Sequence, residues 1–367
     1  MFRCPVQVDI DITHACNLQC IHCSADAGKP LNNELKKEEL FILIDKLYDW
    51  GVMNITLAGG EPLIRLDCLE ILEYALQKRG MMVTLVTNGI LLSDLMLEKM
   101  AKWHRGFQLL ISLDASNQEL YDQIRFGAKL NFYEYIIQKI EKASELEISY
   151  GVSYVLTKLN LNDFITTYEN LNSKGINKFV LIKFIPVGRG MINRDKLELT
   201  YDEWKKIILH ITYDKEKGQY EKMAVSVACP NDLYRPLMEE GYTEEEVETI
   251  WGYVTPLKVE SYKKFRELGC HAGITNLSIG ANGDVYPCAI GMTYEQLICG
   301  NIRKQSIDKI WEHSTVLKQL RDMNLNDIEG SCFECDYRKI CGGGCRIRSF
   351  AKSGRLTTKD YACSNYQ

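Results

Sequence analysis

The chain has 367 residues, 46% of them hydrophobic and 25% charged, which is the balance of a globular protein large enough for one large domain and a smaller one. Its formal net charge of −5, with no basic stripe, argues against nucleic-acid binding. The sequence has no apolar run of 18 or more residues and no signal-peptide pattern, so we expect a cytoplasmic protein without a membrane span. Disulfides are disfavoured in the cytoplasm, and the 14 cysteines need another explanation.

Short β-rich runs alternate with amphipathic stretches through the first 190 residues. The periodicity predicts strands at 6–12, 54–57, 82–87, 108–113, 149–156 and 178–185, and helices at 34–50, 68–77, 94–103, 131–146 and 163–173. Strands regularly separated by helices predict a parallel sheet with right-handed crossovers. Six such units are fewer than the eight of a closed barrel, so we predict an α/β fold, an open partial (β/α)6 TIM-like barrel. Functional residues are then expected at the carboxyl ends of its strands.

The remaining chain changes character twice. Residues 191–269 are charged and helical with weaker patterning, and we interpret them as a bridging region. From residue 270 onward glycine and cysteine become frequent and helical patterns thin out. The sequence therefore predicts three parts: a barrel at 1–190, a bridging helical region at 191–269 and a C-terminal cysteine-rich domain at 270–367.

A first cysteine motif follows the first predicted strand. The segment CNLQCIHC places Cys16, Cys20 and Cys23 in a C-x3-C-x2-C spacing on one short loop. Three thiolates can hold three irons of a cubane cluster and leave the fourth iron open for a cofactor or a substrate. A structural zinc site with His14 or His22 as the fourth ligand is the alternative. It is disfavoured for His22, because neighbouring chain positions do not easily converge on one ion.

This loop resembles the signature of radical S-adenosylmethionine enzymes. In that family the methionine amino and carboxylate groups bind the open iron. The reduced cluster then cleaves S-adenosylmethionine to a 5′-deoxyadenosyl radical, which abstracts hydrogen. The family usually has an aromatic residue before the third cysteine, and here His22 departs from that pattern while keeping a flat ring.

Further segments extend the resemblance to the cofactor site. The family's GGEP motif is matched after the second strand by Gly59, Gly60, Glu61 and Pro62. Glycine there allows close backbone approach, and the glutamate is expected to pair with the methionine ammonium. Taken alone, the segment would be read as a turn with a solvated glutamate. Other expected cofactor contacts lie at or after the ends of the third and fourth strands, at Asn88, Ser112, Asp114 and Arg125.

The residues after the fourth strand have different expected roles in cofactor binding. Ser112 and Asp114 are suitable partners for ribose hydroxyls, whereas Arg125 corresponds to an arginine that lies near the cofactor carboxylate in relatives. A surface ion pair is the alternative for Arg125. The segment 185–190 resembles the end of the family's sixth strand, beside the adenine.

A second set of cysteines occupies the C-terminal part. Its spacing resembles the SPASM domain, an iron–sulfur extension of radical S-adenosylmethionine enzymes, and the triplet Gly342–Gly344 belongs to that pattern. The resemblance implies an outer auxiliary 4Fe-4S cluster held by Cys332, Cys335, Cys341 and Cys363. It implies an inner auxiliary cluster held by Cys270, Cys288 and Cys345. With the first motif, the expected cofactors are three 4Fe-4S clusters and S-adenosylmethionine; tetrahedral zinc is the disfavoured alternative for the C-terminal set.

Seven cysteines cannot fill two four-cysteine clusters. Some relatives supply an eighth cysteine six residues after the first, but that position here is Asn276. The inner cluster therefore has an open iron or borrows a ligand, for which Cys229 is the first candidate and Cys299 a weaker one. Cys4 and Cys68 are interpreted as packing residues.

The resemblance implies a radical enzyme that modifies a ribosomal peptide or protein through a crosslink, thioether, epimerisation or oxidation. Sulfatase maturation is disfavoured, because relatives of that type have an aspartate where this chain has Ala289. A small-molecule enzyme of the haem-precursor type is the alternative, and a non-catalytic electron-transfer or metal-storage protein is the third reading. Expected partners are a peptide or small-protein substrate, a flavodoxin- or ferredoxin-type electron donor and a separate peptide-recognition protein. Asp122, Tyr154 and Tyr286 are not distinguishable as a catalytic base from sequence.

Overall fold

One mixed sheet runs through all three predicted parts of the chain. The computed structural model describes residues 2–103, 105–127, 131–176, 178–219, 223–227, 231–252 and 268–363. Within them lies a ten-stranded sheet with the order β10-β9-β8-β1-β2-β3-β4-β5-β6-β7. Its first seven strands in the chain pair in parallel: β1 (Gln7–Thr13), β2 (Asn54–Gly59), β3 (Met82–Thr87), β4 (Phe107–Ser112), β5 (Tyr150–Leu156), β6 (Lys178–Lys183) and β7 (Ala224–Val227).

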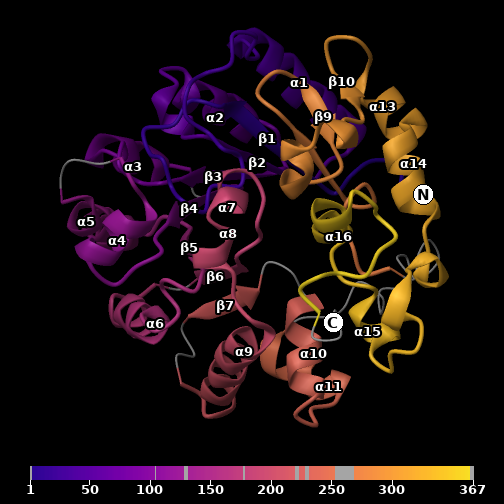
Figure 1. The fold of residues 1–367 in the computed structure, drawn as a ribbon. Coiled ribbons are helices and arrows are strands. Elements are labelled where there is room, and N and C mark those ends of the chain that lie inside the picture. Colours follow the sequence, from indigo (N-terminus) through magenta and orange to yellow (C-terminus); the bar gives the residue numbers. More distant parts are fainter. Residues whose placement is uncertain are drawn as a thin grey trace.

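The crossover helices cover one face of this sheet (Figure 1). They are α1 (Lys37–Trp50), α2 (Cys68–Leu76), α3 (Asp94–Met100), α4 (Gln118–Ile124), α5 (Phe132–Glu145) and α6 (Phe164–Ser173). The predicted stop of α1 is confirmed, since Gly51 has φ 103° and donates its N–H to the carbonyls of Leu47 and Tyr48. Helix α4 was not predicted, because its seven residues are too few to show a clear helical period.

Alternation along the strands separates an apolar face from a polar one. In β1, Val8 and Ile10 are fully buried, whereas Asp9 and Asp11 between and after them keep partial exposure. The same alternation in β4 gives a buried Ile111 and a half-exposed Ser112. The fully buried set forms the main hydrophobic core with the helices. The other set lines the inner face of the partial barrel.

The sheet contains two more parallel strands than the six that the sequence predicts. Strand β7 adds to β6, and β8 (Asn276–Ile279) adds in parallel to the free edge of β1. Each has only four residues, and in β7 Ala224 and Ser226 are exposed, so neither shows a strong apolar period. The sheet remains open, with β7 and β10 at its edges, as predicted for a partial barrel.

Helices of the bridging region follow β6 and flank β7. They are α7 (Arg189–Ile192), α8 (Arg194–Leu197), α9 (Tyr201–Glu216), α10 (Asn231–Met238) and α11 (Glu244–Trp251). Capping boxes begin α9 at Thr200 and α11 at Thr243. The indole of Trp204 in α9 is buried and donates to the carbonyl of Asp232 at 2.8 Å, which fixes α10 against α9.

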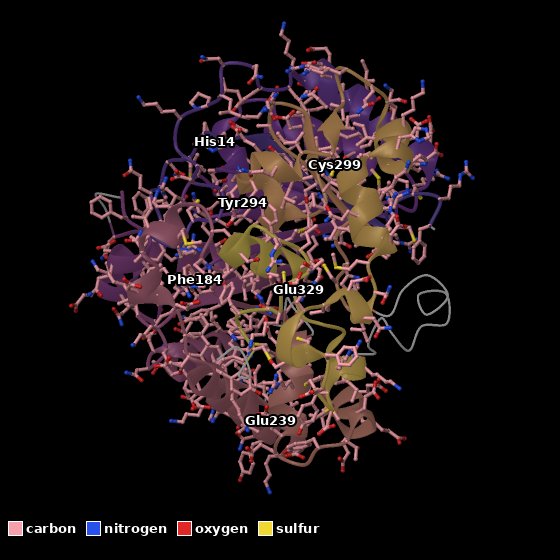
Figure 2. The ribbon with its side chains drawn as sticks, turned by 45° about the vertical axis from the view of Figure 1, so that its right-hand side comes forward. His14, Phe184, Glu239, Tyr294, Cys299 and Glu329 are labelled. Atoms are coloured by element: carbon pink, nitrogen blue, oxygen red, sulfur yellow. The ribbon has the colours of Figure 1, made fainter. Side chains whose placement is uncertain are left out.

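The C-terminal part packs beside the first strand and the bridging helices (Figure 1). It comprises β9 (Asp284–Tyr286), β10 (Gly300–Asn301), α13 (Ile307–His313), α14 (Thr315–Asp322), α15 (Arg338–Cys341) and α16 (Arg346–Ser353). A small second core lies under these elements and includes Cys270, Leu320 and Ile347. Tyr294, labelled in Figure 2, meets Phe350 of α16 edge-on at 5.4 Å. In the part of the chain that the structure describes, no helix is long and apolar enough to cross a membrane.

Candidate active site

The first cysteine loop is held at the carboxyl end of β1. The N–H of Cys16 donates to Gly28 O at 2.9 Å, and the loop residues Gln19 and Ile21 donate to Phe126 O and Ile124 O at 2.6 and 3.0 Å. These bonds join the loop to the end of α4, the helix that the sequence did not reveal. The three thiols of this loop therefore lie where a barrel fold places its chemistry.

The three thiols lie within electrostatic reach of one another. Burial raises the pKa of Cys20 to about 12, against the opposing effect of Arg125, and the neighbouring Cys23 and Cys16 raise it further. Burial also raises the pKa of Cys16. Thiols of this kind do not ionise at neutral pH without a compensating cation, and a bound metal cluster supplies that charge.

The two histidines named as a fourth zinc ligand have other partners. His14 places both ring nitrogens near carbonyl oxygens, of Lys29 at 3.0 Å and of Ala25 at 3.2 Å, while His22 turns Nε2 toward Asp114 at 3.4 Å. Among the described residues, no three Cys, His, Asp or Glu side chains surround one common ion position. Zinc needs its ligands about 2.3 Å from one ion, whereas a cubane binds each thiolate through a different iron.

The glycines of the GGEP segment are required by the end of β1. A Cβ on Gly59, which has φ 131°, would lie 2.2 Å from Thr13 O, and a Cβ on Gly60 would lie 2.2 Å from Ala15 O. The N–H groups of Gly60 and Glu61 donate to these two carbonyls, each at 2.8 Å. The segment with Pro62 therefore continues β2 directly alongside the cysteine loop.

Glu61 is buried, so the alternative of a solvated glutamate is wrong. Its side chain is 1% exposed and accepts hydrogen bonds from Thr87 Oγ1 at 2.7 Å, Asn88 N at 2.7 Å and Leu63 N at 3.1 Å. Burial raises the pKa of Glu61 although these donors act to lower it. The carboxylate thus ties the end of β2 to the end of β3 and keeps one lone pair for a further donor.

Two polar side chains predicted at strand ends contact other parts of the site. Asn88 donates from Nδ2 to Asn17 of the cysteine loop at 2.8 Å. Ser112 at the end of β4 lies 3.3 Å from the hydroxyl of Ser153 in β5. The sequence did not single out Ser153, although its position in the neighbouring strand follows from the parallel register.

Arg125 forms a buried ion pair with Asp114, so the alternative of a surface ion pair is wrong. Its Nε and Nη2 donate to Asp114 Oδ2 at 2.7 and 2.6 Å, with the two residues 6% and 0% exposed. Asp114 Oδ1 accepts the N–H of Val155 at 2.7 Å, and Arg125 Nη1 lies 4.0 Å from Cys20 Sγ. A positive charge therefore lies beside the cysteine loop. Burial lowers the pKa of the nearby His22 to about 4, so its ring is neutral at pH 7.

The segment after β6 packs against the cysteine loop. Gly188 has φ 57°, and a Cβ there would lie 2.3 Å from Ser24 O. Arg189 donates to Cys20 O at 3.2 Å and to Ala27 O at 2.7 Å. Asn193 donates to Ile21 O at 3.1 Å. Arg189 belongs to the segment 185–190 that the sequence analysis named, whereas Asn193 is a site-supporting residue that it did not identify, because a carbonyl contact across 172 residues leaves no local signal.

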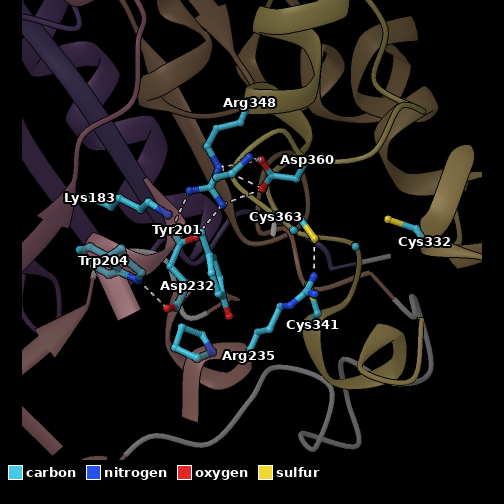
Figure 3. A pocket seen from close by; sticks show the side chains of 14 residues that line it. Lys183, Tyr201, Trp204, Asp232, Arg235, Cys332, Cys341, Arg348, Asp360 and Cys363 are labelled. Atoms are coloured by element: carbon cyan, nitrogen blue, oxygen red, sulfur yellow. Dashed lines mark hydrogen bonds and ion pairs between the residues drawn. The ribbon is translucent and has the colours of Figure 1, made fainter. Parts of the chain in front are cut away.

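Several C-terminal cysteines lie within electrostatic reach of one another. Burial raises the pKa of Cys288 well above its ordinary value, and Cys345 and Cys270 add to that shift. Burial likewise raises the pKa of Cys341 to about 12, with Cys363 and Cys332 among the contributing groups. A cavity of about 40 Å3 is lined by Cys332, Cys341 and Cys363 and by residues of α9 and α10 (Figure 3). Cys335 acts electrostatically on Cys332.

The glycine triplet connects a cysteine of the outer set, Cys341, to one of the inner set, Cys345. Gly342, Gly343 and Gly344 all have positive φ, of 60°, 81° and 74°. Added Cβ atoms would lie 2.2 Å from Gly269 N, 2.1 Å from Ile328 Cδ1 and 2.6 Å from Asp360 Oδ2, respectively. Cys341 and Cys345 therefore face different groups of thiols across only three residues.

The candidates for an eighth ligand have different outcomes. Cys299 is buried in the main core, and its neighbours are Leu297 O at 3.5 Å, Ser314 and Arg321. These neighbours are typical of a packing residue, and the weaker candidacy of Cys299 as an eighth ligand stays a prediction. Cys229 lies outside the described residues. The described cysteines are all free thiols.

Comparison with known proteins shows similarity over nearly the whole chain. The model of the "Radical SAM superfamily" matches residues 10–171, and that of the "Iron-sulfur cluster-binding domain" SPASM matches residues 270–336. An AdoMet-dependent heme synthase of Methanosarcina barkeri is 29% identical over 99% of this chain and 97% of its own. One of Oleidesulfovibrio alaskensis is 30% identical, over 96% of this chain and 86% of its own. The PqqA peptide cyclase of Granulibacter bethesdensis is 24% identical, over 98% and 82%.

Solved structures show the same fold. Streptococcus suis SuiB bound to its precursor peptide SuiA superposes with a TM-score of 0.76 at 17% identity, over 99% of this chain and 77% of that one. The enzyme anSMEcpe with bound AdoMet and Cp18Cys peptide gives a TM-score of 0.73 at 16% identity, over 99% and 95%.

Proposed function

The chain belongs to the radical SAM superfamily and carries a C-terminal SPASM domain, and from that premise we propose that it is the enzyme of a haem-precursor conversion. The supporting observation is the whole-length likeness to AdoMet-dependent heme synthases, at 29–30% identity over 96–99% of the chain. The peptide cyclase and the mycofactocin maturases are 24–25% identical to this chain. These relatives are enzymes, which argues against a non-catalytic electron-transfer or metal-storage function.

Three clusters and one cofactor complete this proposal. We assign one 4Fe-4S cluster to the Cys16, Cys20 and Cys23 loop, an inner auxiliary cluster to Cys270, Cys288 and Cys345, and an outer one to the remaining set, Cys332, Cys335, Cys341 and Cys363. When bound, the first cluster and S-adenosylmethionine supply a radical that takes hydrogen from an unactivated carbon of the substrate. Domain limits at 1–190, 191–269 and 270–367 are part of the proposal, as is a cytoplasmic location in which thiols stay reduced.

The protein's own groups have defined parts in this scheme. Glu61 has a free lone pair at the end of β2 and is proposed to accept the methionine ammonium. The Arg125–Asp114 pair keeps a cation beside the Cys20 thiolate and lowers the cost of a negative cluster there. Gly59, Gly60, Pro62, Asn88 and Ser112 are proposed to complete the cofactor contacts. The polar inner face of the barrel is proposed to take the substrate.

Anaerobic reconstitution tests this function. We expect about 12 irons per chain and release of 5′-deoxyadenosine when dithionite and S-adenosylmethionine are added. Iron coproporphyrin and related carboxylated haem precursors are then supplied one at a time. We expect one of them to be converted to a product of lower mass, in an amount proportional to the 5′-deoxyadenosine released. If every tetrapyrrole of this panel is recovered unchanged while S-adenosylmethionine is cleaved, the haem-precursor assignment is wrong.

Peptide modification is the second candidate function. It is supported by the TM-score of 0.76 to SuiB bound to its precursor peptide, over 99% of this chain. A short peptide gene beside this one, and a mass change of that peptide in the same assay, would favour it over the first candidate. A separate peptide-recognition protein belongs to this candidate alone. A flavodoxin- or ferredoxin-type electron donor belongs to both.

A further inference from the structure

One charged side chain touches a thiol of the outer set directly. Nη1 of Arg235, which belongs to α10 of the bridging region, contacts Cys363 Sγ, as the dashed line in Figure 3 shows. The arginine side chain is only 7% exposed. A charged donor on a sulfur forms a stronger hydrogen bond than a neutral one.

Several partners hold the guanidinium of Arg235 in this position. Its Nε donates to Glu239 Oε1 at 2.9 Å, and Glu239 Oε2 accepts from Tyr201 at 2.8 Å and from Lys205 at 3.2 Å. Glu239 follows α10 and is labelled in Figure 2. The rings of Tyr201 and Tyr337 each lie 5.8 Å from the guanidinium carbon. The carboxylate therefore lies on one side of the arginine and the thiol on the other, with the positive charge between them.

The inner set has a different electrostatic environment. Its neighbouring arginine, Arg348, is 2% exposed and ion-pairs with both Asp232 and Asp360, each at 2.6 Å. Backbone N–H groups donate to two of the inner sulfurs: Arg348 N to Cys345 Sγ at 3.5 Å, and the N–H groups of residues 290 and 291 to Cys288. Arg348 acts on Cys345 through its charge and pairs with two buried carboxylates, whereas Arg235 contacts an outer sulfur directly and pairs with one carboxylate, Glu239.

We propose that Arg235 is a positioning residue for electron transfer: its hydrogen bond to Cys363 raises the reduction potential of the outer auxiliary cluster. Reduction adds one negative charge to a cluster, and a cation on its sulfur stabilises that form. The bond makes transfer of one electron from the inner cluster to the outer one more favourable, with one cluster oxidised and the other reduced. This inference rests on the ligand assignment under the proposed function.

A redox titration followed by electron paramagnetic resonance tests the inference on the full-length, three-cluster protein. A Cys332→Ala/Cys335→Ala variant identifies the outer cluster by the signal that it lacks. In Arg235→Gln, we expect the equilibrium constant for one-electron reduction of that cluster to fall at least tenfold, or about 59 mV. In Glu239→Gln, we expect a shift of opposite sign, because the counter-charge behind the arginine is removed.

Arg355→Gln is the matched control. Arg355 also pairs with a carboxylate, Glu329 at 3.0 Å, but its side chain is 62% exposed. Its removal should leave the potential unchanged, because solvent screens a surface charge. Arg235→Lys keeps the charge and should retain most of the wild-type potential.

The outcomes separate the two proposals. If the wild-type protein binds only about 8 irons and lacks the signal that the double cysteine variant is meant to remove, the three-cluster assignment fails first. If all clusters are present and Arg235→Gln titrates like the wild type, the role of Arg235 is overturned. If Arg235→Gln loses the outer cluster, the test rests on Glu239→Gln, which is expected to raise the reduction potential of that cluster. An unchanged or lowered potential in Glu239→Gln then overturns the inference.

Discussion

Arg348 and Asp232 form a bidentate ion pair, with Nη1–Oδ2 and Nη2–Oδ1 distances of 2.6 and 2.9 Å, and both residues are buried. The pair joins α16 of the C-terminal domain to α10 of the bridging region. On its other side Arg348 donates to Asp360, whose Oδ2 accepts the N–H of Cys345 at 2.7 Å. The position of a proposed cluster ligand therefore depends on a helix 116 residues away in the chain.

Replacing Arg348 by Met should destabilise the protein by about 3–5 kcal/mol, because two buried carboxylates lose the arginine that pairs with both. Thermal unfolding of the anaerobic, cluster-loaded protein measures the effect. The exposed Arg355→Met is the control and should lie within about 0.5 kcal/mol of the wild type. A triple variant that also carries Asp232→Asn and Asp360→Asn should recover part of the loss, since no unpaired charge stays buried. A variant Arg348→Met as stable as the control would contradict the structural role of this network.

The glycine triplet allows a comparison between two glycines of like backbone conformation. Gly344 and Gly354 have φ of 74° and 71°, but a Cβ on Gly344 would lie 2.6 Å from Asp360 Oδ2, while nothing lies within 4 Å of one on Gly354. Gly354→Ala should cost about 1 kcal/mol, the strain of a left-handed alanine. Gly344→Ala should cost more stability than Gly354→Ala. It should also lower the iron content below about 12 per chain, because Cys341 and Cys345 flank the glycine triplet. Equal iron content and equal stability in the two variants would show that the close approach of Gly344 to Asp360 is unimportant.

Local patterns predicted the barrel well and the connections between the three parts poorly. Strand β3 has the bounds that the sequence predicts, residues 82–87, because alternation and turn residues on both sides are local signals. The pairing of β8 with β1 joins residues about 270 positions apart, and neither strand's own pattern reveals its partner. The Asp232–Arg348–Asp360 network was missed for the same reason. The ten proposed cluster ligands, in contrast, follow from the resemblance of the cysteine spacing to the family's motifs, and seven of them lie in two short segments, 16–23 and 332–345.

The first cysteine loop is predicted to be separable from the auxiliary sets. A Cys16→Ala/Cys20→Ala/Cys23→Ala variant should keep the C-terminal domain intact, because that domain has its own small core. We expect about 8 irons per chain and no release of 5′-deoxyadenosine in the dithionite assay. Iron analysis and product quantification on the same sample provide the measurement. Release of 5′-deoxyadenosine at the wild-type rate by this variant would exclude the loop as the cofactor-cleaving site.

Asp11 on the inner face of β1 is expected to reduce stability at neutral pH. Burial raises its pKa to about 7, with Asp9 on the same strand raising it further and His14 acting against both. Tyr286 of β9 also lies within electrostatic reach of Asp11. The unfolded chain has a pKa of about 3.9 at this residue, so between these values the folded state binds more protons. The free energy of unfolding therefore falls as the pH rises from about 4 to about 7 and stays lower above that.

Asp11→Asn removes the ionising group and should make the protein more stable than the wild type at pH 8. The gain should be about 2 kcal/mol larger at pH 8 than at pH 5.5, at about 1.4 kcal/mol per pH unit up to pH 7. The difference in thermal unfolding between variant and wild type at the two pH values measures this effect and cancels contributions that both proteins share, such as acid loss of the clusters. Asp49→Asn, at an exposed position on α1, should change stability by less than about 0.5 kcal/mol at both. A difference between Asp11→Asn and the wild type that is the same at pH 5.5 and pH 8 would mean that Asp11 does not titrate in this window.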